Sequence, residues 1–64
     1  MKTYSLESVA RELDISQRSV LREVKDGVLL TIRVRGRVLV LEEDLQQYLA
    51  KKRQYAEQMR VEAH

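Results

Sequence analysis

Three arginines lie close together in a stretch of the chain that contains no acidic residue. Arg33, Arg35 and Arg37 surround Gly36, and residues 27–41 contain neither aspartate nor glutamate. Basic and acidic side chains nearly balance elsewhere, so this segment supplies the positive excess behind the net charge of +2. A guanidinium group donates several hydrogen bonds in a planar fork that matches phosphate. The stretch therefore predicts contacts with the phosphates of a nucleic acid, or insertion of one arginine into a narrow minor groove.

A second group of polar and basic side chains, between residues 16 and 25, has the spacing of one helix face. Arg18 and Arg22 are four residues apart, so a helix places them on the same side. Arginine can bind guanine through two hydrogen bonds, and a glutamine such as Gln17 can bind adenine in the same way. Ser16 and the amides of a helix N-terminus suit a phosphate, whereas Lys25 adds charge. The two groups together give the predicted DNA contacts: Ser16, Gln17, Arg18, Ser19, Arg22, Lys25, Arg33, Arg35, Gly36 and Arg37.

Simpler explanations exist for part of this charge. Taken alone, Arg22 and Lys25 are better interpreted as the solvated face of a helix, and Arg22 can pair with Asp26 one turn later. The basic run Lys51–Arg53 suits a helix C-terminus as well as it suits a DNA contact.

Two short helices joined by a turn are predicted to position the second group. Ser5 and Ser16 are favourable N-cap residues, while Asp14 and Gly27 tolerate the left-handed conformation at a helix end. Apolar residues recur at helical spacing between these signals. The predicted buried stripes are Leu6, Val9, Ala10 and Leu13 in the first helix, and Val20, Leu21 and Val24 in the second. This arrangement is a helix-turn-helix.

A β-hairpin is predicted to carry the three arginines, because the apolar period changes to two between residues 29 and 41. A two-residue loop at Arg35-Gly36 would place an arginine on the apolar face of the hairpin. We therefore predict a three-residue loop over 35–37, which puts four β-branched side chains on one buried face. This register pairs Val34 with Val38 and Ile32 with Val40.

The last predicted element is a helix from residue 42 to about residue 53. Its first turn is acidic, as the helix dipole favours, but Leu41 offers no side-chain acceptor, so a shifted or frayed start is expected. Its apolar face is formed by Leu45, Tyr48 and Leu49, and both Tyr4 and Tyr48 are assigned to core packing. We expect a winged helix-turn-helix domain of the α+β class over 1–53 and a helical tail over 54–64, in which His64 has no role.

Several functional classes are not expected. The chain has no cysteine and one histidine, so neither a disulfide, a thiolate metal site nor a nucleophilic cysteine can form. The acids at 42–44 crowd one helix start, which suits the dipole better than acid–base catalysis. We therefore expect a binding protein without enzymatic activity, cofactor, metal or small-molecule ligand. No apolar run approaches the length of a membrane span, and a cytoplasmic location is expected.

The residues resemble the excisionase family of winged helix-turn-helix domains, which are relatives of the MerR DNA-binding domain. Five fragments match the landmarks of that family in order, and the resemblance as a whole extends over residues 4–50. The two most informative are Leu13-Asp14-Ile15-Ser16-Gln17-Arg18-Ser19-Val20, which is similar to the family's turn, and Val34-Arg35-Gly36-Arg37, which is similar to its wing. The others are residues 4–10, 25–29 and 43–49.

The resemblance implies an excisionase, or recombination directionality factor, that binds tandem DNA sites, bends DNA and steers a phage-type integrase towards excision. Its expected partners are double-stranded DNA, further copies of the chain and the integrase. A small phage or bacterial transcriptional regulator is the alternative, and the lack of a sensing domain favours the excisionase. A third possibility is a DNA-binding adaptor whose terminal helix contacts a protein through Tyr55, Met59 and Val61.

Overall fold

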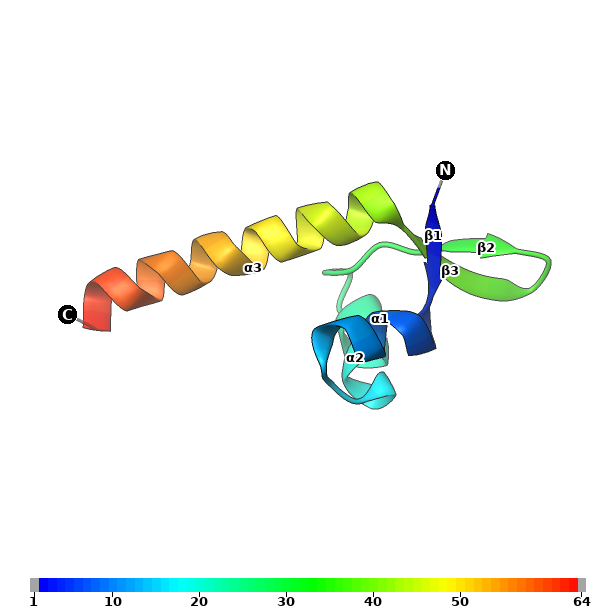
Figure 1. The fold of residues 1–64 in the computed structure, drawn as a ribbon, viewed down its shortest axis with the longest axis horizontal. Coiled ribbons are helices and arrows are strands. Elements are labelled where there is room, and N and C mark those ends of the chain that lie inside the picture. Colours follow the sequence, from blue (N-terminus) through cyan, green and yellow to red (C-terminus); the bar gives the residue numbers. More distant parts are fainter. Residues whose placement is uncertain (1, 64) are drawn as a thin grey trace.

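The helix-turn-helix, the wing and the last helix form one small α+β domain, as predicted. The computed structural model describes residues 2–63, and describes side chains up to residue 57. The elements follow the order β1 (Thr3–Ser5), α1 (Leu6–Leu13), α2 (Gln17–Lys25), β2 (Ile32–Val34), β3 (Arg37–Leu41) and α3 (Glu42–Ala63). The wing lies at one end of the elongated molecule, and α3 runs away from it towards the other end (Figure 1).

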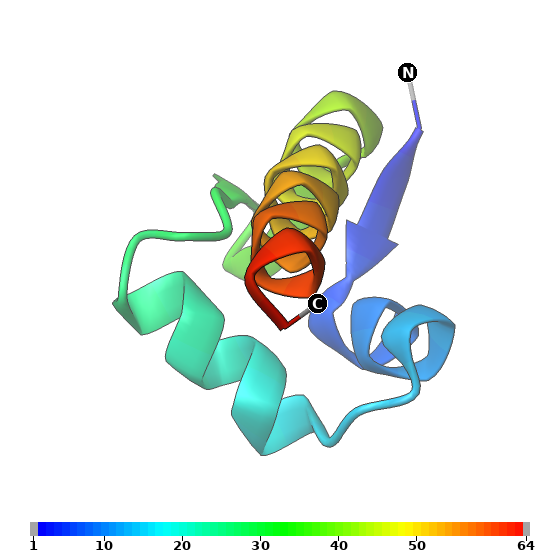
Figure 2. The same cartoon turned by 90° about the vertical axis from the view of Figure 1, so that its left-hand side faces the viewer.

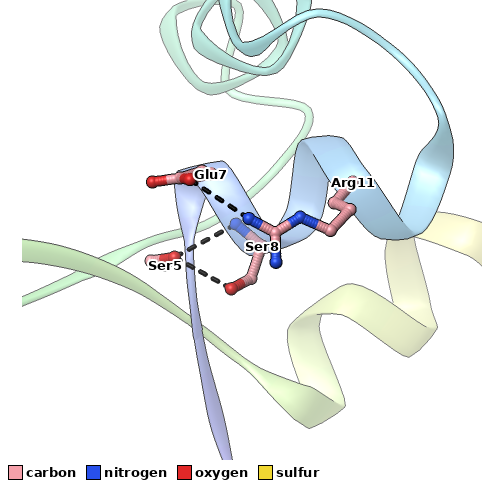
Figure 3. A network of polar contacts seen from close by, with 4 residues as sticks. All are labelled: Ser5, Glu7, Ser8 and Arg11. Atoms are coloured by element: carbon pink, nitrogen blue, oxygen red, sulfur yellow. Dashed lines mark hydrogen bonds and ion pairs between the residues drawn. The ribbon is translucent and has the colours of Figure 1, made fainter.

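Both short helices begin and end where the sequence signals place them. The Ser5 hydroxyl accepts a hydrogen bond from the Ser8 amide at 3.0 Å, and an exposed ion pair between Glu7 and Arg11 lies on the same helix (Figure 3). Asp14 ends α1 in the left-handed conformation, with φ 56° and ψ 43°.

The second helix, α2, has the same kind of start and a glycine at its end. The Ser16 hydroxyl caps it by accepting from the Ser19 amide at 3.1 Å. At the far end, the Gly27 amide donates to the Val24 carbonyl and the Val28 amide to the Glu23 carbonyl, each at 3.0 Å. This bonding pattern requires a positive φ, which Gly27 supplies at 76°.

The core lies where α1, α2 and α3 meet the sheet. Figure 2 views α3 nearly end-on, with α1 and α2 below it on either side. Partly buried side chains, including Tyr4, Leu6, Leu13, Val24 and Leu49, pack around this centre. The predicted stripe of α1, the apolar face of α3 and the assignment of both tyrosines to packing are thus confirmed. The buried residues are Val9, Ala10, Val20, Leu29, Val40, Leu45 and Tyr48.

Leu21 was wrongly assigned to the buried stripe of α2. Its side chain is 44% exposed, whereas that of the preceding Val20 is 1% exposed. Val20 and Val24 are one turn apart and face the core, and Ser19 and Glu23 adjoin them as half-buried residues. Successive helix residues are about 100° apart, so Leu21 falls outside this face.

The predicted register of the wing is also wrong. Strands β2 and β3 pair Ile32 with Leu39, Arg33 with Val38 and Val34 with Arg37, so the loop has two residues. Arg35 and Gly36 both have positive φ, at 50° and 78°, as in the type I′ turn. The backbone twist of this turn matches the twist of the two strands that it joins. The match contributes more to stability than the burial of a fourth β-branched residue would. Val34 is consequently 46% exposed.

A third strand, which the sequence did not reveal, completes the sheet and supports the start of α3. Strand β1 pairs antiparallel with β3, which gives the order β1-β3-β2. Next to this pairing, the Glu42 amide donates to the Lys2 carbonyl at 3.0 Å, and the Tyr4 hydroxyl donates to the Glu42 carboxylate at 3.1 Å. The helix therefore begins directly after Leu41, without the shift expected from its lack of a capping side chain.

Helix α3 runs to Ala63, so it contains both the helix predicted over 42–53 and most of the tail over 54–64 that was predicted to be helical. It passes through residues 53 and 54 without interruption, and the proposed division of the chain there stays a prediction. In the described part of the chain, no helix is both long enough and apolar enough to span a membrane.

Candidate nucleic-acid interface

One face of α2 presents its basic residues to solvent. Gln17, Arg18, Leu21, Arg22 and Lys25 are all exposed, and their spacing places them along one side of the helix. We call these five residues the recognition stripe. The second helix of a helix-turn-helix enters the major groove, where its N-terminal residues meet the base edges. The structure thus brings together four of the residues predicted to contact DNA and adds a leucine among them.

Within residues 2–57, no acidic side chain forms an ion pair with the arginines of the stripe. In residues 2–57 the ion pairs are Arg11 with Glu7, Lys52 with Glu23, and Arg53 with Glu57. Arg22 therefore does not form the ion pair with Asp26 that the sequence allowed. Its guanidinium remains available for an external partner.

The N-terminus of α2 is arranged differently from the stripe. The Ser16 hydroxyl lies 2.9 Å from the Ser19 hydroxyl and already caps the helix, and Ser19 is half-buried. The hydroxyl groups of both serines are therefore already engaged in hydrogen bonds at the start of α2. The amides of Gln17 and Arg18 precede the first intrahelical hydrogen bond, so these amides suit a phosphate better than the serine side chains do.

The wing arginines are exposed but do not share one side of the hairpin. Arg33 pairs with Val38 and lies on the sheet face that carries the buried Val40, whereas Arg37 lies on the opposite face. Arg35 occupies the turn itself, next to Gly36. The tip of the wing can therefore contact phosphates on both of its sides, or place one guanidinium in a minor groove.

A network between α2 and α3 holds the recognition stripe in place. The Tyr48 hydroxyl donates to the Glu23 carboxylate at 2.7 Å, and the Lys52 ammonium lies 3.1 Å from the same oxygen. The ammonium also lies 5.6 Å from the centre of the Tyr48 ring. These bonds fix α2 against α3 from the side opposite to the stripe.

The titration of these groups reflects that network. The hydrogen bonds from Tyr48 and Lys52 hold the pKa of Glu23 below its usual value. Burial, together with the Glu23 carboxylate, raises the pKa of Tyr48 to about 12. The spacing of Tyr48 and Lys52, one turn apart, was visible in the sequence, but their partner on another helix was not.

The residues predicted to contact a protein all belong to α3. Tyr55 is 62% exposed, as such a role requires. The side chains of Met59 and Val61 lie outside the described residues. In the basic run at 51–53, Lys52 and Arg53 are engaged with Glu23 and Glu57, which favours its structural interpretation over DNA contact.

The comparison with known families agrees with this geometry. Residues 3–53 match the model of a family described as a helix-turn-helix domain. This match spans both helices of the motif, the wing and the first half of α3, which is well over half of the chain. No curated protein and no solved structure matches the chain. The family match and the exposed basic stripe on the second helix lead to one conclusion: this chain belongs to the helix-turn-helix domain family and is a DNA-binding protein.

Proposed function

We propose that the protein is an excisionase that binds tandem DNA sites, bends the DNA between them and directs a phage-type integrase towards excision. The proposal starts from the resemblance of residues 4–50 to that family of winged helix-turn-helix domains. A single small domain reads only a short DNA segment, so useful specificity requires several copies side by side. An excisionase assembled on tandem sites meets this requirement.

The observation that carries the proposal is the exposed stretch of α3 over residues 50–57. Among the side chains of α3 that the structure describes, that of Leu49 is the last to pack against the core, and every side chain from Ala50 to Glu57 is exposed. The helix nevertheless continues to Ala63. A helix that extends so far beyond its own core, with Tyr55 exposed on it, supports contact with a neighbouring copy or with the integrase. Such contacts would make binding to adjacent sites cooperative.

The test is a footprint of the purified protein on DNA fragments from its own genome. The excisionase proposal predicts protection of repeated sites beside an integrase attachment site, with bending detected by circular permutation of the bound fragment. Protection of one isolated promoter site would instead identify a transcriptional regulator and overturn the proposal.

A second measurement tests the role of α3. Deletion of residues 54–64 should weaken cooperative filling of adjacent sites and leave the affinity for a single site unchanged. Because the core ends at Leu49, circular dichroism of the shortened chain should show a folded domain. Unchanged cooperativity in this variant would remove the contribution assigned to α3.

A further inference from the structure

Leu21 is one of several exposed large apolar residues, and it is distinguished by its place within the recognition stripe. It lies in the middle of the recognition stripe, 44% exposed, with Arg18 and Lys25 one turn away on either side and Arg22 beside it. Together with Asp26, these residues line an open hollow on the surface of α2. Exposure of a leucine side chain to water is unfavourable, and the core does not use it.

The surroundings of Leu21 indicate which kind of partner covers it. A protein partner would have to bury Arg18, Arg22 and Lys25 together with the leucine, which requires acidic groups around an apolar contact. DNA presents the same combination in its major groove, with phosphates and acceptor atoms for the arginines and one apolar group on the base edges. That apolar group is the 5-methyl of thymine.

The position of Leu21 along α2 also fits a base contact. With a rise of about 1.5 Å per residue, Leu21 lies about 4.5 Å beyond Arg18 along the helix axis. Neighbouring base pairs are about 3.4 Å apart. The two spacings are comparable, so if Arg18 binds a guanine, Leu21 is within reach of the adjoining base pair.

From these observations we infer that Leu21 is a specificity-determining residue, which contacts the 5-methyl group of a thymine next to the guanine bound by Arg18. The inference rests on the assignment of α2 as the DNA-reading helix, and it is independent of whether the protein is an excisionase or a regulator. The hydroxyl-free, branched side chain discriminates thymine from cytosine by apolar contact alone. It adds to the arginine contacts a preference that they do not supply.

Replacement of thymine by deoxyuridine tests this contact directly, because it removes the methyl group and keeps every hydrogen-bonding atom. The preferred duplex is first selected from a random-sequence pool, and each thymine of the site is then replaced singly by deoxyuridine. One replacement, next to the guanine on which Arg18 acts, should weaken binding by the wild-type protein about 3- to 5-fold, the effect of one buried methyl group. Replacements elsewhere in the site should have no such effect.

The variant Leu21→Ala should bind the thymine and deoxyuridine duplexes with equal affinity, while Leu21→Met should retain most of the discrimination. Leu30→Ala is the matched control, because Leu30 is 57% exposed and lies outside α2, and it should discriminate like the wild type. Because Leu21 is on the surface, Leu21→Ala should fold normally.

The outcomes separate this inference from the function on which it rests. If no duplex is bound specifically, the assignment of α2 as the reading helix fails. Binding that depends on Arg18 would support the assignment of α2. If the Leu21→Ala variant then still prefers the thymine duplex to the deoxyuridine duplex as strongly as the wild type does, whether or not its overall affinity falls, the thymine contact alone is overturned. An affinity for DNA unchanged by Leu21→Ala, with loss of cooperative assembly, would identify a protein contact in its place.

Discussion

The Tyr48 hydroxyl of α3 and the Glu23 carboxylate of α2 are joined by a hydrogen bond of 2.7 Å. The Tyr48 ring belongs to the core, whereas Glu23 lies on the half-buried side of the helix whose other side carries the recognition stripe. Lys52 binds the same carboxylate oxygen at 3.1 Å. The orientation of α2, the second helix of the helix-turn-helix, is thus linked to α3 by a polar contact in addition to apolar packing.

Removal of this hydroxyl should lower the stability of the domain. A hydrogen bond to a charged group contributes roughly 1.5–3 kcal/mol, and partial exposure of Glu23 to water reduces that value. We expect Tyr48→Phe to lower the free energy of unfolding by about 1 kcal/mol, measured by urea denaturation. Tyr55→Phe, on the exposed part of the same helix, is the control and should have no effect. A loss no larger for Tyr48→Phe than for this control would show that the bond contributes nothing.

Burial of Tyr48, together with the same bond, should make its contribution to stability depend on pH. Its pKa is raised to about 12 in the folded protein, whereas an unfolded tyrosine ionises near pH 10. A raised pKa means that the folded state favours the protonated hydroxyl. The stabilisation is therefore complete below pH 10 and is lost as the pH rises towards 12. The difference in unfolding free energy between wild type and Tyr48→Phe should shrink over that interval.

At acid pH the carboxylate of Glu23 should have the opposite dependence. Its pKa is lowered in the folded state, so its contribution is present above the usual glutamate pKa and is lost as the pH falls through the folded value. The stability difference between wild type and Glu23→Gln should narrow as the pH falls below about 4.3, the usual glutamate pKa. A difference that stays constant from pH 7 to pH 3 would contradict this role of the carboxylate.

Arg35 is expected to lower the stability of the folded domain and to raise its affinity for DNA. Its φ of 50° places a residue other than glycine in the left-handed region, where asparagine is better tolerated. We expect Arg35→Asn to raise the free energy of unfolding by about 0.5 kcal/mol, because the Asn-Gly pair favours this turn. The variant should bind DNA more weakly, with a salt dependence reduced by about one phosphate contact. A more stable variant with unchanged affinity would mean that Arg35 does not contact DNA.

Arg18 and Arg35 should differ in the kind of binding that they support. We expect Arg18 to contact a base edge, so Arg18→Ala should lower the discrimination at one base pair by roughly 1–3 kcal/mol, about 5- to 150-fold. We expect Arg35 to contact a phosphate instead, so Arg35→Ala should weaken binding evenly across sequences. Selection from random duplexes with each variant distinguishes these effects. An equal loss on all sequences for both variants would contradict this division.

Local signals in the sequence were sufficient to predict the helix-turn-helix. Ser5 and Ser16 cap their helices, and Asp14 and Gly27 end them, because each acts on backbone groups only a few residues away. The stripes of α1 and α3 followed from the helical period. The basic residues of α2 were placed together for the same reason.

Features that depend on distant residues were not predictable in this way. Strand β1 is three residues long and exists because β3 lies beside it. The register of the wing depended on whether a tight turn or the burial of Val34 contributes more to stability, and the structure has the tight turn. Leu21 was assigned to the core because its type suggested burial, yet only the packed positions of α1 and α3 determine which side of α2 is covered.

The central claim is that the recognition stripe and the wing bind DNA. The most direct test of this claim is the salt dependence of binding to the selected duplex. Contacts with about four to six phosphates predict a slope of log affinity against log salt concentration of about −4 to −5. The predicted result is this slope together with tighter binding to the selected duplex than to random DNA. Absence of binding even at low salt, or affinity that does not change with salt, would contradict the claim.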